Sequence, residues 1–122
     1  MTLLSACANT KQNTIYSVSD MPPAVRIDGL MVGSASRLAL YTYSGDGPNT
    51  SACVDTCVQQ WPPLLATEGD VSRGDFTVFT RPDGLRQWAL VGKPLYFWSG
   101  ERQPGETGGE AVDPQWRAFR VQ

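Results

Sequence analysis

The sequence predicts an all-β fold made of two similar antiparallel units of about 55 residues, packed as a small sandwich or barrel. Three observations support this prediction. The chain of 122 residues contains 12 Gly and 9 Pro, which favour short strands joined by turns. It shows no long helical pattern. The segment LYTYSGD at residues 40–46 is almost repeated 55 positions later as LYFWSGE, which indicates a duplicated unit.

A gapless shift of 55 positions also aligns other parts of the chain. The further identities are Arg26 with Arg81, Asp28-Gly29-Leu30 with Asp83-Gly84-Leu85, and Gln60-Trp61 with Gln115-Trp116. Each unit alone offers too few strands to bury an apolar face. We therefore expect one domain over residues 15–122, in which repeats at about 15–67 and 68–122 pack around a pseudo-twofold axis.

The first unit contains four expected strands and one short helical turn. The strands are AVRI, LMVG, LALYTY and WPPLLA, at residues 24–27, 30–33, 38–43 and 61–66. The helical turn is expected in NTSACVDTCVQQ, at residues 49–60, with Thr50 or Ser51 as its cap. The prolines that follow end the helix, because proline has no amide hydrogen.

The second unit repeats this order of strands. DFTVFTR at 75–81 and LRQWALV at 85–91 are expected to pair through a tight Asp-Gly turn. GK at 92–93 begins the next turn before PLYFW at 94–98. WRAFRV at 116–121 alternates between two faces and closes the unit.

The chain has three cysteines. If Cys7 carries a lipid, as discussed below, Cys53 and Cys57 remain as an even pair, which suits an oxidising compartment. Residues four apart in a helical turn have Cα atoms about 6 Å apart, within disulfide range. We therefore expect a structural disulfide. The alternative is redox or metal use, although the spacing differs from thioredoxin-type motifs and the chain has no His to complete a copper site.

The start of the chain contains Leu4-Ser5-Ala6-Cys7, which fits the bacterial lipobox. In that interpretation Cys7 carries the lipid and the polar segment at 8–14 is a flexible tether. The basic region and apolar stretch of a signal peptide do not precede it. The alternative is a frayed N-terminus with a spare thiol.

The chain resembles a family of secreted-repeat bacterial lipoproteins with a Y-x4-D motif, whose function is not established. Tyr41…Asp46 matches that motif, and Tyr96…Glu101 matches it with Glu in place of Asp. The resemblance continues through the cysteine pair, WPP, RPDGLRQ, GKPLYFW and PGETGGE, and covers about residues 15–122. It implies export from the bacterial cell and lipid anchoring. We therefore expect the membrane as a partner through the anchor, and the aromatic residues suggest an envelope protein or a glycan as a further partner.

The motif tyrosines are expected in the core between the units, with the motif acids accepting backbone N–H groups of the loops that follow. The alternative is a symmetric ligand site lined by both copies. The four tryptophans, Trp61, Trp88, Trp98 and Trp116, could form an aromatic platform for a sugar or a partner protein, but a place in the core is the preferred interpretation for aromatic residues in a small β domain. Trp88 and Trp98 lie on neighbouring expected strands and could share an exposed binding face.

The loop SGERQPGETGGEAVDP at residues 99–114 is rich in acids and glycines. Its candidate calcium ligands are Glu101, Glu106, Glu110 and Asp113. The spacing does not match an EF-hand, so a solvated acidic loop is the preferred interpretation, and we expect no metal or cofactor.

The function classes are narrowed by charge and composition. The net charge of −2 and the absence of a basic stripe argue against nucleic acid as a partner. Without His there is no conventional catalytic triad, and a pair such as Asp46 with Glu101 is the remaining route to hydrolysis. We expect a non-catalytic binding or interaction module. The alternative is a redox or electron-transfer accessory that uses Cys53 and Cys57.

Overall fold

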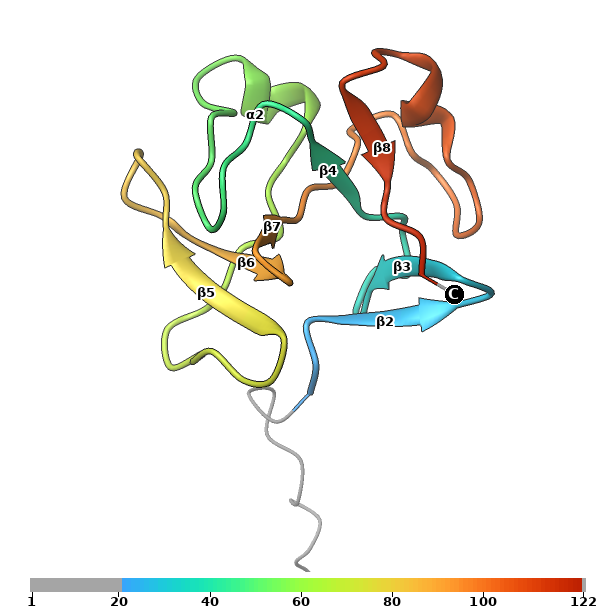
Figure 1. Cartoon of the computed structure of the whole chain (residues 1–122). Helices are drawn as coiled ribbons and strands as arrows, with labels where there is room; N and C mark the ends of the chain where they lie inside the picture. The colour runs from blue at the N-terminus through green and yellow to red at the C-terminus, as the bar shows by residue number, and fades with distance from the viewer. Residues whose placement is uncertain (1–20, 122) are drawn as a thin grey trace, which may run out of the picture.

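The computed structural model describes residues 21–121, so Cys7 and the expected tether lie outside the described residues. The elements in chain order are β2 (Ala24–Ile27), β3 (Leu30–Gly33), β4 (Tyr41–Tyr43), α2 (Cys57–Gln60), β5 (Phe76–Thr80), β6 (Arg86–Leu90), β7 (Lys93–Pro94), the 3-10 helix η3 (Gly108–Ala111) and β8 (Trp116–Ala118). All strand pairs are antiparallel, in the sheets β2-β3, β4-β8 and β5-β6-β7 (Figure 1). The predicted all-β class and the two-unit organisation are confirmed.

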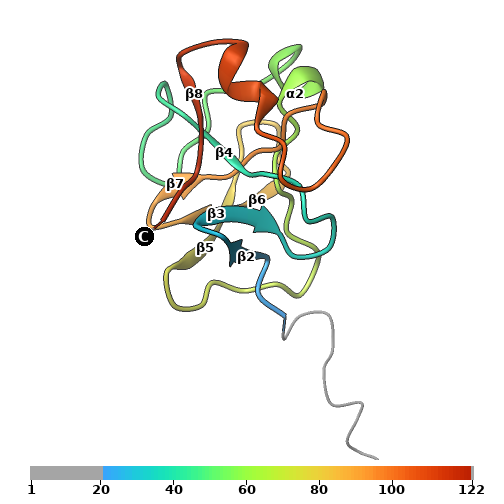
Figure 2. The same cartoon turned by 90° about the vertical axis from the view of Figure 1, so that its right-hand side faces the viewer.

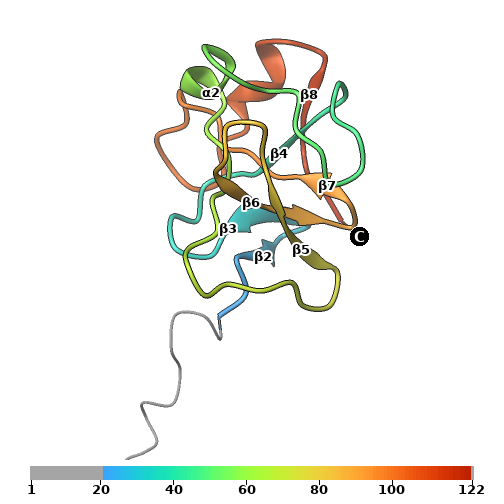
Figure 3. The ribbon, with the colours of Figure 1, turned by 90° about the vertical axis from the view of Figure 1, so that its left-hand side faces the viewer.

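The three sheets are small and separate, and isolated β-bridges join them. Tyr96 forms two of these bridges, one to Tyr41 and one to Pro63. Further bridges join Leu65 to Gln87 and Leu30 to Arg120. In all three ribbon views α2 lies at one end of the molecule and β2, β3 and β5 lie toward the other (Figures 1–3). No helix in residues 21–121 is long and apolar enough to cross a bilayer.

Two hairpins are closed by two-residue turns with positive φ angles. Asp28 and Gly29, at φ 52° and 80°, connect β2 to β3. Val91 and Gly92, at φ 49° and 80°, connect β6 to β7. Two-residue turns of this kind have a backbone twist that matches the twist of the flanking antiparallel strands, and they require positive φ at both central residues. The second turn is therefore Val91-Gly92, one residue earlier than the sequence predicted.

The expected strand at 61–66 is an extended segment without a ladder of its own. Pro62 and Pro63 lack the amide hydrogens that a ladder needs. Instead, the carbonyl of Pro62 accepts a hydrogen bond from the Phe97 amide at 2.7 Å, and the Leu64 amide donates to the Leu95 carbonyl at 2.9 Å. The segment is thus held by the second repeat.

The helical turn begins later than expected, and its predicted caps are wrong. Helix α2 starts at Cys57, and its N-cap is Thr56, which makes no side-chain hydrogen bond. Ser51 is buried instead, with 4% of its surface exposed. Its hydroxyl lies 2.6 Å from the Tyr96 hydroxyl and 3.1 Å from Arg81 Nη1. These inward contacts take it away from the helix terminus.

The two repeats exchange their C-terminal segments around a pseudo-twofold axis. At the axis, Tyr41 and Tyr96 bond to each other through both backbone amides, at 2.7 and 3.0 Å. The Phe119 amide of the second repeat bonds to the Leu40 carbonyl of the first, at 2.8 Å. Leu64 and Leu95 correspond to Phe119 and Leu40 at the 55-residue offset, and they make the reciprocal bond: the Leu64 amide donates to the Leu95 carbonyl at 2.9 Å. Figure 2 shows the C-terminal segment running from β8 past β4 to the level of β3.

The gapless alignment does not hold in the hairpins. Met31 and Trp88 have equivalent places, because each amide bonds to the swapped end of the other repeat, at Phe119 and Leu64. Trp88, however, lies two residues beyond the position that the 55-residue offset gives to Met31. The loop between β5 and β6 is longer than its counterpart, so Arg81 is not the structural equivalent of Arg26.

Two buried clusters form the core. The first contains Ala39, Tyr41, Cys53, Trp61, Tyr96, Trp116 and Ala118. The second contains Ala24, Met31, Leu40, Leu90 and Leu95. Both clusters draw side chains from both repeats, so neither repeat has a complete core of its own.

Candidate functional site

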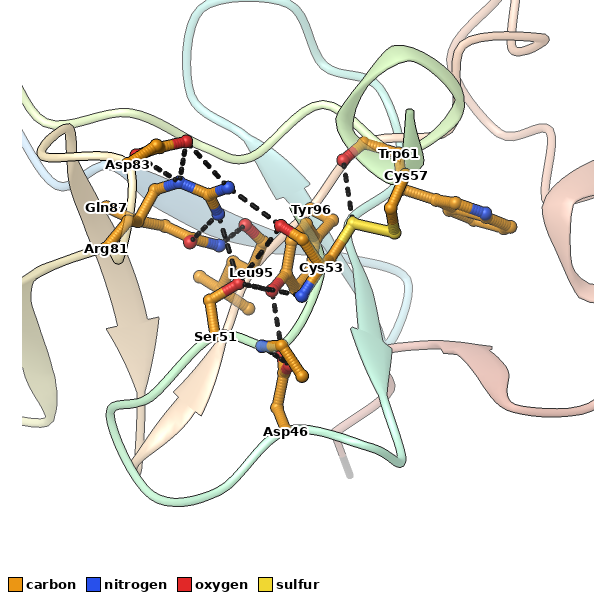
Figure 4. Close-up of a disulfide and its surroundings, with 11 residues drawn as sticks. Asp46, Ser51, Cys53, Cys57, Trp61, Arg81, Asp83, Gln87, Leu95 and Tyr96 are labelled. Carbon is orange, nitrogen blue, oxygen red and sulfur yellow. Dashed lines mark hydrogen bonds and ion pairs between the residues drawn. A yellow bond between two sulfur atoms is a disulfide. The ribbon is translucent and has the colours of Figure 1, made fainter. Parts of the chain in front are cut away.

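Each motif tyrosine binds the motif acid of the other repeat. Tyr41 and Tyr96 are fully buried. The Tyr41 hydroxyl donates to Glu101 Oε1 at 2.6 Å, and the Tyr96 hydroxyl donates to Asp46 Oδ2 at 2.8 Å. Figure 4 shows the second of these bonds. The structure therefore brings together tyrosine and acid from different copies, and Asp46 and Glu101 serve different tyrosines rather than forming one carboxylate pair.

The other oxygen of each acid holds its own loop. Asp46 Oδ1 accepts the Ala52 amide at 2.7 Å, and Glu101 Oε2 accepts the Gly108 amide at 3.0 Å. The Tyr41 hydroxyl also accepts the Gly109 amide, at 3.1 Å. Each tyrosine thus enters a loop of the opposite repeat and is held there by hydrogen bonds to buried polar groups.

These contacts shift the pKa values of the groups involved. Burial, followed by the hydrogen bond to Glu101, raises the pKa of Tyr41 well above its usual range. Burial likewise raises the pKa of Tyr96. For Asp46, burial raises the pKa above 3.8, against the opposing effect of the bonds from Ala52 and Tyr96. Both tyrosines therefore remain protonated at neutral pH.

The raised pKa of Asp46 predicts a specific pH effect. The folded state binds this proton more tightly than the unfolded state, so the stabilisation is complete below pH 3.8 and is lost as pH rises through the folded pKa. Asp46→Asn should remove this falling component of the unfolding free energy, measured by urea titration at a series of pH values.

Asp83→Asn is the control for this experiment. The hydrogen bond from Arg81 lowers the pKa of Asp83, so its stabilisation is present above pH 3.8 and is lost as pH falls. The two variants should change the pH slope in opposite directions. Equal changes of the same sign would contradict this assignment.

Four rings lie in a row across the repeats, which we call the aromatic column: Tyr43, Trp116 and Trp61 are stacked, and Trp98 is tilted against Trp61. The central indoles, Trp61 and Trp116, lie 4.1 Å apart with an interplanar angle of 1°. Tyr43 stacks on Trp116 at 4.5 Å, and Trp98 lies 6.5 Å from Trp61. Tyr43 and Trp98 are 55 positions apart, so the column has the symmetry of the repeat.

The glycine before each motif acid makes room for the ends of the column. A Cβ at Gly45 would lie 2.7 Å from the Tyr43 ring, and one at Gly100 would lie 2.5 Å from the Trp98 ring. Real Cβ atoms do not approach other atoms so closely. The Ser-Gly dipeptide in both copies is therefore a packing requirement.

Arg81, which the sequence reasoning missed as a site residue, is a buried arginine that ties three segments together (Figure 4). Its guanidinium donates to the Cys53 carbonyl and to Gln87 Oε1, both at 2.8 Å. It also pairs with Asp83 at 3.0 Å. The RPDG segment is the only local signal, and it indicates a turn rather than a buried charge.

The expected disulfide between Cys53 and Cys57 is confirmed, with Cα atoms 5.3 Å apart. Cys53 is fully buried and Cys57 is half-buried. Because the Cys53 carbonyl also accepts a bond from Arg81, the disulfide and the arginine hold the same loop.

Replacing both cysteines by alanine should lower the free energy of unfolding by about 2 kcal/mol, because the bond closes only a short loop. The β signature in circular dichroism should persist, since Arg81 still holds the segment. Chemically reduced wild-type protein should show the same loss in urea titration. Complete loss of structure would show that the disulfide, rather than the exchange between repeats, maintains the fold.

Trp88 and Trp98 do not form the exposed face that the sequence suggested. Trp88 is 5% exposed, because β6 is the central strand of its sheet, and its ring meets Phe76 edge-on at 6.1 Å. Trp98 packs against Trp61 instead. The two tryptophans therefore belong to different parts of the core.

The acids of the 99–114 loop have separate partners. Glu106 accepts the amides of Arg102 and Gln103, and Glu110 pairs with Arg120 at 2.6 Å. Asp113 Oδ1 accepts the Gln115 amide at 2.9 Å. Within residues 21–121 no three acidic or metal-binding side chains lie close enough to hold a metal ion.

A cleft of about 380 Å³ with a mixed polar and apolar lining lies between the repeats, and we call it the inter-repeat cleft. Its lining includes Thr42, Ser44, Asp46, Lys93, Gln115 and Arg117. One wall is fixed by the Asn49 amide, which donates to the Gly92 carbonyl at 2.8 Å. Lys93 and Arg117 are exposed, and among the described residues neither forms a salt bridge, although Arg117 interacts electrostatically with Glu110.

A model of a protein family described as a secreted repeat of unknown function matches the chain twice, at residues 24–65 and 77–120. Both matches are shorter than the 55-residue units expected from the sequence. Comparisons with curated proteins and with solved structures find no match. The two family matches contain the tyrosines, acids and tryptophans that the repeats exchange. The chain belongs to this family of secreted repeats of unknown function and carries two copies of the repeat.

Proposed function

We propose that the protein is a non-catalytic binding module of the bacterial cell envelope, anchored by a lipid on Cys7, which takes an acidic glycan in the inter-repeat cleft. Membership of a secreted family and the Cys53–Cys57 disulfide support an oxidising, exported location. The lipobox at Leu4–Cys7 supports the anchor. The ligand class follows from the chemistry of the cleft.

The observation that supports this proposal is a pair of exposed cations that line the cleft and form no salt bridge among the described residues. Lys93 lies on β7 and Arg117 on β8, and both line the same cavity. Asp46 also lines the cleft, but its two oxygens accept bonds from Tyr96 and the Ala52 amide, and it forms no salt bridge with Lys93 or Arg117. A ligand carboxylate would gain two charge-assisted contacts there.

The remaining lining suits a sugar. The hydroxyls of Thr42 and Ser44 and the amide of Gln115 offer donors and acceptors around the two charges. The walls come from both repeats and are fixed by the Tyr96–Asp46 and Asn49–Gly92 bonds. A cleft held in this way loses little conformational entropy when it binds.

The test compares a uronic-acid oligosaccharide, a neutral oligosaccharide of equal length and a glutamate-rich peptide in calorimetric titrations. The acidic oligosaccharide should bind best, and its affinity should fall as salt rises. Lys93→Ala with Arg117→Ala should weaken binding roughly tenfold or more, since bonds to charged groups contribute about 1.5–3 kcal/mol each.

The matched control is Arg73→Ala with Arg102→Ala, which removes the same charge outside the cleft. This control should change the affinity only slightly. Equal losses of affinity in both double variants would mean that net charge, rather than the cleft, determines binding. Stronger binding of the peptide than of the acidic oligosaccharide would contradict a glycan ligand and would indicate a protein partner.

The second candidate function is a redox accessory role for Cys53 and Cys57. The observation that favours it is that Cys57 lines a surface cavity of about 380 Å³ beside Trp61 and Trp116. Thiol titration after equilibration at graded glutathione potentials decides between the roles. A pair that resists reduction supports a structural disulfide, and one that cycles at physiological potentials supports redox use.

A further inference from the structure

The aromatic column joins two partly exposed rings through the buried core. Successive ring centroids from Tyr43 through Trp116 and Trp61 to Trp98 are 4.5, 4.1 and 6.5 Å apart. The two central indoles are each only 3% exposed. Tyr43 lines the inter-repeat cleft at one end, and Trp98 lines a second surface cavity at the other. Electron exchange between rings falls off with distance, so the stacked part from Tyr43 to Trp61 is the closest path, and the tilted step to Trp98 is the longest.

Each central indole also contacts a buried tyrosine that is paired with a carboxylate. Tyr41 meets Trp61 edge-on at 5.3 Å, and Tyr96 meets Trp116 edge-on at 5.0 Å. The bonds from these tyrosines to Glu101 and Asp46 are 2.6 and 2.8 Å long. The arrangement occurs twice, once on each side of the axis.

This pairing matters because a phenol gives up an electron readily only when its proton has an acceptor. A carboxylate oxygen at 2.6–2.8 Å is within proton-transfer reach. At rest the phenol proton stays in place, since burial raises the pKa of both tyrosines. The proton therefore moves only when the ring is oxidised.

We propose that the column and its two tyrosine–carboxylate pairs form a one-electron relay. A one-electron oxidant outside the protein removes an electron from Tyr43 or Trp98 at the surface. An electron from Tyr41 or Tyr96 then passes through Trp61 or Trp116 to the oxidised ring. The donating phenol becomes a neutral phenoxyl radical, its proton passes to Glu101 or Asp46, and the external oxidant is reduced by one electron. This inference is independent of glycan binding.

The experiment generates tris(bipyridine)ruthenium(III) by a light flash in the presence of the full chain and follows radicals by electron paramagnetic resonance. Fluorotyrosine is placed at position 41 or 96, which keeps the ring and the hydroxyl and so preserves the fold. Fluorine hyperfine splitting of the trapped signal is expected at both positions. A radical found only on Tyr43 or Tyr16 would overturn the proposal.

Two acid variants test the proton acceptors and serve as controls for each other. With Glu101→Gln the fluorine splitting should be lost at position 41 and kept at position 96, and Asp46→Asn should give the reverse. Near-ultraviolet circular dichroism verifies that each variant is folded. Splitting that is unaffected by either substitution would overturn the relay, since the phenol proton would then have another acceptor.

Discussion

Replacement of Trp116 by alanine is expected to cost about 3–5 kcal/mol of unfolding free energy, the range for large aromatic residues removed from a core. That loss is comparable to the whole stability of a marginal domain. Trp116 has a stacked ring on each face, Trp61 and Tyr43, and the Tyr96 ring at its edge. It comes from the second repeat, whereas two of these three neighbours come from the first.

Urea titration followed by circular dichroism measures this loss, with Trp98→Ala as the matched control. Trp98 is half-buried and lies at the end of the column, so its removal should cost clearly less. Trp61→Ala combined with Trp116→Ala should cost less than the sum of the single variants, because the two indoles contact each other. A Trp116→Ala loss below about 1 kcal/mol would contradict a shared core.

Replacement of Arg81 by alanine is expected to cost about 3 kcal/mol, because it leaves several buried acceptors without a donor. The Cys53 carbonyl and Gln87 Oε1 lose their bonds to the guanidinium, and Asp83 loses its ion pair. Asp83 is partly exposed, so the ion pair contributes the smaller share.

Arg102→Ala is the control, since Arg102 carries the same charge but is exposed on the 99–114 loop. Its loss should be close to the few tenths of a kcal/mol typical of surface substitutions. Both values come from urea titrations at neutral pH. Equal losses would mean that Arg81 acts only as a surface charge.

Features of the fold with a local signal in the sequence could be predicted. Alternating residues and turn dipeptides located the hairpins β2-β3 and β5-β6, and the spacing of Cys53 and Cys57 predicted their disulfide. The repeat itself predicted a shared core with tyrosines and tryptophans from both copies. Each of these inferences needs only neighbouring residues or the self-similarity of the chain.

The exchange between repeats could not be predicted in the same way. Tyr41 has two chemically similar acids available, Asp46 in its own copy and Glu101 in the other, and sequence spacing favours the wrong one. The same ambiguity applies to the ends of the repeats, because Phe119 and Leu64 are equivalent residues that occupy each other's sheets. Long-range pairing between similar segments leaves no local pattern.

The burial of Arg81 and Trp88 could not be predicted from the sequence, for a related reason. Arg81 is satisfied by groups from two other segments, the loop at 51–53 and strand β6, which come together only in the folded chain. Trp88 lies on a strand that is central only because the hairpin at Val91-Gly92 folds β7 back onto β6. Burial of both residues therefore depends on tertiary structure.

The central claim, that each tyrosine binds the acid of the other repeat, is tested most directly by two double-mutant cycles. Tyr41→Phe is combined with Glu101→Ala in one cycle and with Asp46→Ala in the other, and unfolding free energies are measured in urea. The structure predicts a coupling energy of about 1 kcal/mol or more with Glu101 and one near zero with Asp46, since only contacting residues couple. Coupling of Tyr41 to Asp46 with none to Glu101 would contradict the exchange of side chains between the repeats.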